Sequence, residues 1–211
     1  MPLKLVSHPL VADRLGYLRD KSTTPPQFRD LLQQLGFFLF YEASRECSHL
    51  READVVTPLG WTTRTIFDDK KIVLVPILRA GLGMLELILR IVPNAEIYHV
   101  GIYRDEKTLK PIVYYSNLSS SISGKDVFIL DPMVATAGSV AKCHEMVKAF
   151  NPRTIITLCA IISPEGAHIL EKEAPDMQIY AASLDAGLTE NGYIYPGLGD
   201  AGDRYFGNVR T

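Results

Sequence analysis

The sequence predicts an α/β fold in which a parallel sheet carries helices on both faces. Several segments are apolar along their whole length rather than alternating, as in strands that are buried on both faces. Helical patterns separate these segments, and such alternation is typical of a parallel sheet. The chain has 211 residues, of which 47% are hydrophobic and 22% charged, so we expect one domain spanning residues 1–211.

The first expected helix follows the Ser-, Thr- and Pro-rich stretch "RDKSTTPPQFRD". Apolar residues recur at helical spacing from Phe28 to Leu39, and we expect the helix to run on to about Cys47. Additional aromatic residues make it apolar on more than one face, which leaves two interpretations open: deep burial or a subunit interface. These residues are Phe37, Phe38, Phe40 and Tyr41.

Five apolar runs form the expected sheet. In chain order they are "KIVLVPILRAG", "AEIYHVGIYR", "DVFILD", "RTIITLCAIIS" and "MQIYAASL". The helical patterns "MLELILRIV", "GSVAKCHEMVKAF" and "PEGAHILEKEA" follow the first, third and fourth runs. In open sheets of this kind, ligands bind beyond the carboxyl ends of the strands. Arg79, Arg104 and Asp131 stand at such ends, which makes them candidate site residues.

Two segments interrupt the alternation. Residues about 104–120 contain the strand-like "PIVYYSNL" and no helical pattern, which predicts a β-hairpin arm. The tail, about residues 184–211, is rich in glycine, and we expect it to form an ordered loop region over one end of the sheet.

The stretch "VFILDPMVATAGSV", residues 127–140, carries the clearest chemistry. An apolar strand ends at Asp131, and small residues with Thr136 and Ser139 lead into a helical pattern. Main-chain N–H groups at the start of a helix lack internal partners and lie at the positive end of the helix dipole, so this turn can bind an anion. Asp131 would repel phosphate, but it can accept hydrogen bonds from ribose hydroxyls or bind a metal. An acid beside a phosphate cradle therefore indicates a ribose phosphate.

We call residues 131–139 the phosphate loop. A plain helix cap by Thr or Ser explains its "TAGS" part equally well, but not the acid at the end of the strand. The segment is not a P-loop, because G-x-x-x-x-G-K-[ST] is absent, and no G-x-G-x-x-G follows a strand. The second absence disfavours a dinucleotide-binding protein.

Composition limits the partners. The net charge of −2, without a long basic run, disfavours nucleic acid. No apolar run reaches the roughly 20 residues of a membrane span, and "MPLKLVSHPL" is too short and mixed for a signal peptide, so we expect a cytoplasmic protein. Cysteines and histidines form no catalytic or metal-type pattern and are expected to be structural or exposed. They are Cys47, Cys143, Cys159, His8, His49, His99, His144 and His168.

Together these features resemble the type I phosphoribosyltransferases, whose signature is an apolar strand, an acid and a small loop of Thr, Gly and Ser. Two adjacent acids are usual there, whereas Pro132 follows Asp131 here, and "LDPMVATAGS" is similar to the variant of the uracil phosphoribosyltransferase family. The segments "HPLVADRLGYLRDKST", "FRDLLQQLGFFLFYEASRE", "PILRAGLGM", "GIYRDE" and "GYIYPGLGDAGDRYFG" also resemble that family in order and spacing. Ala137 and Tyr195 depart from it, since glycine and a smaller aliphatic residue are common there.

The resemblance implies a type I phosphoribosyltransferase fold with a β-hairpin arm and a C-terminal base-binding hood, residues about 184–211. The implied reaction converts uracil and 5-phosphoribosyl 1-diphosphate (PRPP) to UMP and diphosphate. Catalytic roles fall on Arg79, Arg104, Asp131 and Asp200. PRPP would bind to Arg79, Arg104, Asp200 and the phosphate loop, namely Asp131, Pro132, Met133, Val134, Ala135, Thr136, Ala137, Gly138 and Ser139. Uracil would contact Ile194, Gly199, Asp200 and Ala201, while Asp203 would support the loop.

The resemblance also implies Mg²⁺ as cofactor, carried by PRPP with Asp200 as the candidate residue near it. GTP is a candidate activator, and a homodimer or homotetramer is expected. Lys107 is either a diphosphate ligand or, more simply, a solvated hairpin lysine. Two alternatives stay open: a phosphoribosyltransferase for another base, and a nonenzymatic PRPP- or RNA-binding regulator of the same fold.

Overall fold

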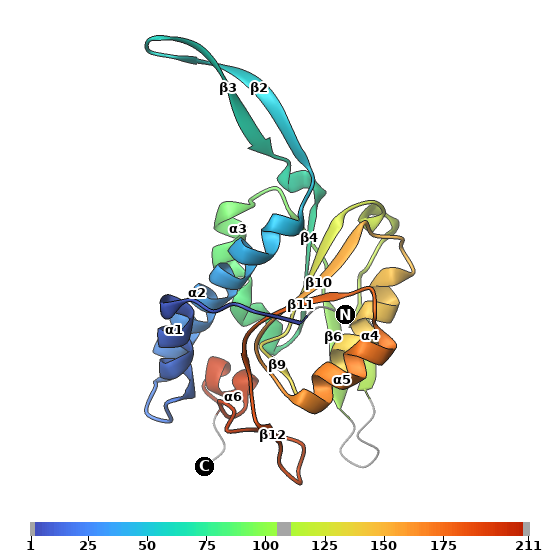
Figure 1. Cartoon of the computed structure of the whole chain (residues 1–211). Coiled ribbons are helices and arrows are strands. Elements are labelled where there is room, and N and C mark those ends of the chain that lie inside the picture. Colours follow the sequence, from blue (N-terminus) through green and yellow to red (C-terminus); the bar gives the residue numbers. More distant parts are fainter. Residues whose placement is uncertain (1–2, 105–110, 209–211) are drawn as a thin grey trace.

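The computed structural model describes residues 3–104 and 111–208, without the side chain of Arg104. A nine-stranded sheet forms its centre (Figure 1). Neighbouring strands of the main path pair in parallel, except that β6 and β7 pair antiparallel. In spatial order the path is β1 (Leu3–Leu5), β11 (Gln178–Leu184), β10 (Thr154–Ile162), β8 (Asp126–Leu130), β4 (Ile72–Leu78), β6 (Val100–Arg104) and β7 (Pro111–Ser116). The short β5 (Glu96–Ile97) pairs with β4, and β9 (Met133–Val134) pairs with β10.

Helices cover both faces of this sheet, which confirms the predicted fold class (Figure 1). The residues of β8 show why the strands are apolar throughout. Phe128 and Leu130 belong to one buried cluster, Val127 and Ile129 to the other. The first cluster also contains buried residues of α1 (Pro9–Arg19), α2 (Pro25–Ala43) and α3 (Glu86–Ile91). The second contains buried residues of α4 (Gly138–Lys148) and α5 (Pro164–Glu173).

The long helix α2 begins at Pro25, where the Gln27 side chain accepts a hydrogen bond from the Thr24 N–H at 3.0 Å. It ends at Ala43, and a 3₁₀ turn, η1 (Ser44–Glu46), carries the chain to Cys47. Of its extra aromatic residues, Phe40 is buried and lies 4.9 Å from Phe128 between ring centroids, whereas Tyr41 is exposed. The helix is therefore a core helix with an apolar outer edge.

Two expected elements differ in detail. The run "AEIYHVGIYR" breaks into β5 and β6, and the helix expected over "MLELILRIV" shortens to α3, which follows a 3₁₀ segment, η3 (Ala80–Met84). The remaining elements are η2 (Asp69–Lys71), η4 (Ser120–Ile122), β12 (Gly187–Leu188), β13 (Ile194–Tyr195) and α6 (Ala201–Phe206).

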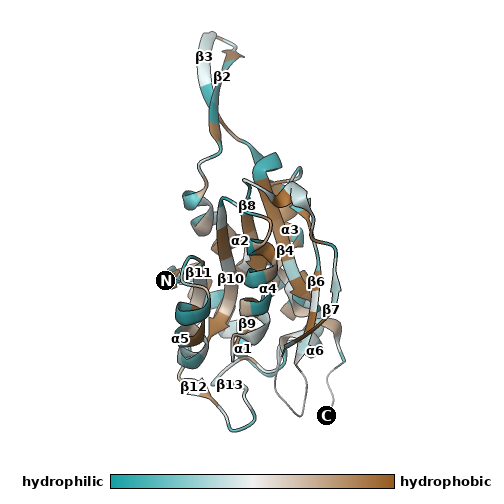
Figure 2. Ribbon diagram, turned by 90° about the vertical axis from the view of Figure 1, so that its right-hand side faces the viewer, coloured by the Kyte–Doolittle hydropathy of each residue, from teal (hydrophilic) through white to brown (hydrophobic). Residues whose placement is uncertain are grey.

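Elements without a counterpart among the predictions include β1, α1 and a hairpin of β2 (Leu50–Thr57) and β3 (Gly60–Phe67). The hairpin projects away from the sheet, at the end opposite α6 and β12 (Figure 1). Its colouring in Figure 2 mixes hydrophilic and hydrophobic residues along both strands. Leu59 and Trp61 near its tip are exposed. A pattern without a buried face carries no strong strand signal.

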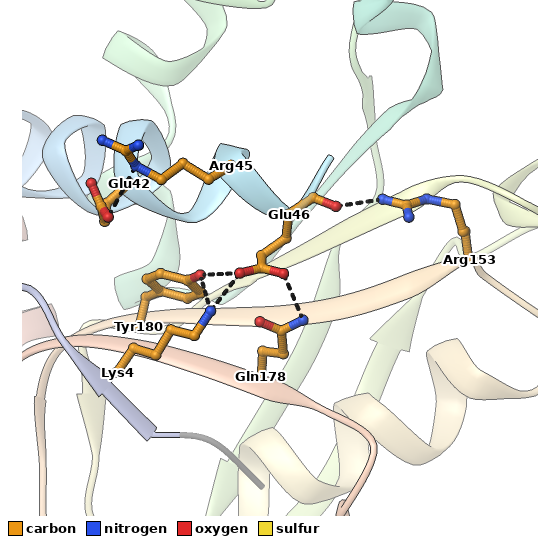
Figure 3. Close-up of polar contacts among 7 residues, drawn as sticks. All are labelled: Lys4, Glu42, Arg45, Glu46, Arg153, Gln178 and Tyr180. Carbon is orange, nitrogen blue, oxygen red and sulfur yellow. Dashed lines mark hydrogen bonds and ion pairs between the residues drawn. The ribbon is translucent and has the colours of Figure 1, made fainter. Parts of the chain in front are cut away.

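The N-terminal strand is tethered by the side chain of Glu46 (Figure 3). Its carboxylate accepts hydrogen bonds from Lys4, from the Tyr180 hydroxyl at 2.9 Å and from the Gln178 amide at 3.4 Å, while its main-chain carbonyl accepts one from Arg153 at 2.9 Å. This cluster joins β1, η1 and β11 at one edge of the sheet. Among the described residues, no helix combines the length and apolarity that crossing a bilayer requires.

Candidate active site

The predicted site residues gather at one end of the sheet. The phosphate loop follows β8, and η3 with Arg79 follows β4, both at the carboxyl ends of parallel strands. Figure 1 shows α6 and β12, which belong to the glycine-rich tail, at the same end. An added Cβ on Gly81 would lie 2.2 Å from the Leu130 carbonyl oxygen, so η3 is pressed against the end of β8.

The phosphate loop encloses a small cavity of about 130 Å³. The α4 amino end begins at Gly138, so its unpaired N–H groups border this cavity. A second helix supports the loop: the Ser163 hydroxyl donates to the Ala135 carbonyl at 2.6 Å, and a Cβ on Gly166 would lie 2.4 Å from that same oxygen. The cavity is lined by Asp131, Met133, Val134, Ala135, Thr136, Ala137, Gly138, Ser139 and Val140.

Pro132 stands apart from the other residues of the loop. It is buried, and its carbonyl accepts hydrogen bonds from Ala160 and Ile161 of β10, at 3.0 and 3.1 Å. The main chain of this residue therefore joins the loop to the sheet by hydrogen bonds, and the residue does not line the cavity.

Ala137 adopts the left-handed conformation, with φ 60° and ψ −4°. Such a conformation costs an L-residue roughly 1–2 kcal/mol, which glycine avoids. This position is the departure noted in the sequence, where glycine is common, and the structure shows that the backbone accommodates alanine only in a conformation that favours glycine. The neighbouring Gly138 is less constrained, since an added Cβ would meet the Pro111 ring at an ordinary 3.4 Å.

Asp131 follows β8 directly and is partly exposed toward the cavity. Burial among the core strands raises the pKa of its carboxyl to about 7, and the hydrogen bond that it accepts from the Met133 N–H, at 3.3 Å, offsets this only in part. The carboxylate thus has unused acceptor capacity next to the phosphate cavity, where a hydroxyl group could donate to it.

Arg79 reaches from the end of β4 toward α6. Its Nη2 lies 3.8 Å from an Asp203 carboxylate oxygen, and its guanidinium stacks 5.3 Å from the centre of the Phe206 ring. The side chain is 58% exposed, so the guanidinium remains accessible to a ligand. The peptide bond between Leu78 and Arg79 is cis. Arg104 lies at the carboxyl end of β6, but its side chain, like Lys107, falls outside the described part of the chain.

The glycine-rich tail folds over this end of the sheet. Ile194 and Ala201 are buried, whereas Gly199 and Asp200 are exposed and line a larger cavity of about 650 Å³. Asp200 caps α6, because its side chain accepts a hydrogen bond from the Asp203 N–H at 2.8 Å. Tyr195 is 64% exposed.

The predicted residues thus form two groups rather than one cavity. The phosphate loop lines the small cavity, Gly199 and Asp200 line the larger one, and Arg79 contacts Asp203, which also lines the larger cavity. Sequence reasoning missed a third group, Arg19, Asp185 and Arg204, which holds the tail in place. Its contacts between Arg19 and Asp185 and between Arg204 and Leu18 join residues more than 160 positions apart, so no local pattern could have revealed them.

Two of the histidines and the three cysteines take structural positions. His8 caps α1 by accepting a hydrogen bond from the Leu10 N–H at 3.1 Å, and His144 is buried 3.2 Å from Asp176. The three cysteines are unpaired, and burial raises the pKa of each thiol, which keeps them protonated and unreactive.

Comparison with known proteins agrees with this geometry. The model of the family described as "Uracil phosphoribosyltransferase" matches residues 5–208. The chain belongs to the uracil phosphoribosyltransferase family. A uracil phosphoribosyltransferase of Dictyoglomus turgidum is 45% identical over 203 residues, 96% of this chain and 98% of the relative. One from Bacillus cereus (strain B4264) is 42% identical over 205 residues, 97% and 98% of the two chains.

A solved structure, that of the AQ2163 protein from Aquifex aeolicus, has the same fold. It superposes with a TM-score of 0.92 at 38% identity and covers 97% of this chain and 98% of its own. The family match, over residues 5–208, includes the phosphate loop and the described part of the tail.

The donor groups of the site suit a magnesium ion brought by a substrate. Among the described residues, no three His, Cys, Asp or Glu side chains converge as a metal cage. Mg²⁺ is commonly held by one or two carboxylates together with substrate phosphates. Asp200 and Asp203 are the carboxylates on the α6 side that fit such a role.

Proposed function

We propose that this chain is a uracil phosphoribosyltransferase, which transfers the 5-phosphoribosyl group of PRPP to N1 of uracil and produces UMP and diphosphate. The observation that carries the proposal is the phosphate loop. An acid at the end of a buried strand borders a cavity closed by the amino end of a helix, in a chain that belongs to this family along residues 5–208.

Each part of the loop has a role in binding PRPP. The N–H groups at the start of α4 and the hydroxyls of Thr136 and Ser139 would hold the 5-phosphate. The Asp131 carboxylate would accept hydrogen bonds from the ribose hydroxyls, which need an acceptor that phosphate does not offer. Pro132 contributes indirectly, since it fixes the loop to β10.

The transfer breaks the bond between ribose C1 and the diphosphate oxygen and forms a bond from C1 to uracil N1, which loses its proton. Negative charge grows on the diphosphate as the ribose becomes cationic. Arg79, and Arg104 by its place on β6, would stabilise the departing diphosphate. When bound with PRPP, Mg²⁺ would neutralise further charge on the diphosphate.

Uracil presents alternating carbonyl and N–H groups along its edge. Main-chain groups of Ile194, Gly199 and Ala201 can match this pattern without charged side chains, and Asp200 can serve both uracil and PRPP. A homodimer or homotetramer, activation by GTP and a cytoplasmic location stay predictions.

The test measures UMP formation from labelled uracil, PRPP and Mg²⁺, with cytosine as the matched alternative base. Uracil should be converted and cytosine poorly so, because its amino group is a donor where uracil has an acceptor. Each main-chain donor left unpaired costs about 1–3 kcal/mol. Equal rates with both bases would overturn the base assignment, and no turnover with any base would overturn the enzymatic function.

A further inference from the structure

The tail is fixed to the body of the protein by three charged side chains, Arg19, Asp185 and Arg204, which we call the hood clamp. Asp185 follows β11, and its side chain is only 1% exposed. Arg19 at the end of α1 donates from Nη1 to Asp185 Oδ2 at 2.7 Å and pairs through Nη2 with the other carboxylate oxygen. Burial disfavours the Asp185 carboxylate, but the hydrogen bonds from Arg19, Ser183 and the Gly197 N–H outweigh it and lower its pKa.

This ion pair binds both the N–H and the carbonyl of Gly197 in the main chain of the tail. The Gly197 N–H donates to Asp185 Oδ2 at 2.9 Å, and the Gly197 carbonyl accepts from Arg19 Nη1 at 2.7 Å. Gly197 has φ +67°, and an added Cβ would lie 2.2 Å from the Ile194 carbonyl oxygen. The turn from Ile194 to Gly197 is therefore set tightly, with both polar groups of Gly197 satisfied by one ion pair.

Arg204 makes the reciprocal connection from the other side. It lies in α6, and its guanidinium donates to the carbonyls of Leu198 at 2.6 Å and Asp20 at 2.6 Å, and to that of Leu18. The same group stacks over Phe28 of α2, 4.5 Å from the ring centre. Residues 18–20 are thus joined to the tail twice: their own Arg19 binds the tail, and Arg204 of the tail binds their main-chain carbonyls.

The clamped carbonyls of residues 197 and 198 immediately precede Gly199, Asp200 and Ala201, the residues expected to contact uracil. Main-chain groups have no side-chain rotamers with which to correct a displacement, so their direction depends on what fixes the neighbouring peptide planes. A shift of about 1 Å in such groups weakens a binding site severely.

We propose that Arg19, Asp185 and Arg204 are positioning residues that set the affinity for uracil and the choice of base by fixing the main chain at residues 197–201. The proposal rests on the proposed function for the identity of the base. Among the described residues the clamp makes no hydrogen bond to the phosphate loop or to Arg79, and of the residues expected to bind PRPP only Asp200 lies in this segment, so PRPP binding should depend on the clamp much less than uracil binding does.

Kinetics on single variants provide the first test. Arg19→Ala and Arg204→Ala should raise KM for uracil at least tenfold and leave KM for PRPP within twofold. For Arg19→Lys and Arg204→Lys, KM for uracil should lie between the values of the alanine variant and the wild type. Arg14→Ala is the matched control, because this arginine of α1 bonds Gln34, at 2.6 Å, and Asp13 instead of the tail. A parallel rise in both KM values, or an unchanged KM for uracil, would overturn the proposal.

A double variant separates positioning from stability. Arg19→Ala leaves the buried Asp185 carboxylate without its cation, which destabilises the fold. Adding Asp185→Asn removes that charge, so the double variant should recover much of the lost melting temperature but keep the raised KM for uracil, since nothing holds the Gly197 carbonyl. Recovery of a wild-type KM together with stability would overturn the proposal and leave the pair a purely structural role.

Hydrogen exchange gives a readout that does not depend on activity. Peptides covering residues 197–201 should exchange at least tenfold faster in the double variant than in wild type or Arg14→Ala, with the phosphate loop unchanged. Unchanged exchange at residues 197–201 would overturn the clamp even if wild type forms UMP. If wild type forms no UMP, the proposed function fails, and accelerated exchange still supports the clamp.

Discussion

Replacement of Asp131 by asparagine should stabilise the free protein and abolish PRPP binding in the same variant. Burial raises the pKa of this carboxyl from 3.8 to about 7. Because the folded value lies above the unfolded one, the contribution of Asp131 to stability is fully present below pH 3.8 and is lost as the pH rises through about 7. At pH 8 the folded protein holds an ionised carboxylate in a site that disfavours it.

The magnitude follows from the difference between these pKa values. About three pH units at about 1.4 kcal/mol each give about 4 kcal/mol at pH 8, and the part already lost at pH 5 is less than 2 kcal/mol. For a chain of this length 1 kcal/mol corresponds to about 2–4 °C in melting temperature. Asp131→Asn should therefore raise the midpoint by up to roughly 8–16 °C at pH 8 and by less than half as much at pH 5.

Thermal melting of both proteins at the two pH values, without ligand, measures the stability effect. Calorimetric titration with PRPP at pH 6 and pH 8 measures binding. The wild type should bind PRPP more tightly at pH 8, where Asp131 is ionised. The substrate phosphates also titrate in this range, and the same measurement on Asp131→Asn shows how much of the pH dependence comes from them. A variant that melts at or below the wild-type temperature at pH 8, or that binds PRPP normally, would refute the role assigned to Asp131.

Three further substitutions test other parts of the site. Arg79→Ala should lower kcat by about 10²–10³ while the free energy of unfolding changes by less than about 0.5 kcal/mol, as kinetics and urea titration of one preparation would reveal. Gly81→Ala should destabilise the fold by about 1–3 kcal/mol in thermal melting, since its Cβ would meet the Leu130 carbonyl. Gly16→Ala has open space around its Cβ and should raise the melting temperature by stabilising α1. Ala137→Gly should raise the free energy of unfolding, measured by urea titration, by up to about 1 kcal/mol. The gain is the relief of left-handed strain minus the cost of the extra freedom that glycine gives the unfolded chain. A fall of the same size would contradict the strain.

The sheet could be predicted from the sequence because its strands are buried on both faces. Val127 to Leu130 alternate between two cores, so every position must be apolar, and the run is visible without any structure. The hairpin β2–β3 lies at the other extreme. Apart from Phe67 at its base, the hairpin packs little against the body, so its residues carry no strong periodic signal, and only its pairing reveals it.

The same contrast holds in the candidate site. The phosphate loop is contiguous, and its chemistry depends on residue types that follow one another in the chain. The hood clamp is assembled from α1, the residue after β11 and α6, and Arg19 in it binds Asp185, which lies 166 positions away in the chain. Arginine and aspartate are common on surfaces, and nothing local distinguishes a buried pair from a solvated one. Ala137 shows a third case, since the sequence identified the departure but only the backbone gave its conformation.

Two unfavourable features of the phosphate loop point to the same cause. Ala137 holds a left-handed conformation, and Asp131 holds a carboxylate that burial disfavours, although both lie beside a well-packed core. Neither feature helps the free protein to fold, and an unstrained helix cap would need neither. The proposed phosphoribosyl ligand would account for both, because the turn would aim main-chain N–H groups at its phosphate and the carboxylate would accept hydrogen bonds from its hydroxyls. Local strain of this kind is expected of a binding loop rather than of a plain connection between a strand and a helix, and it supports the proposed phosphate site.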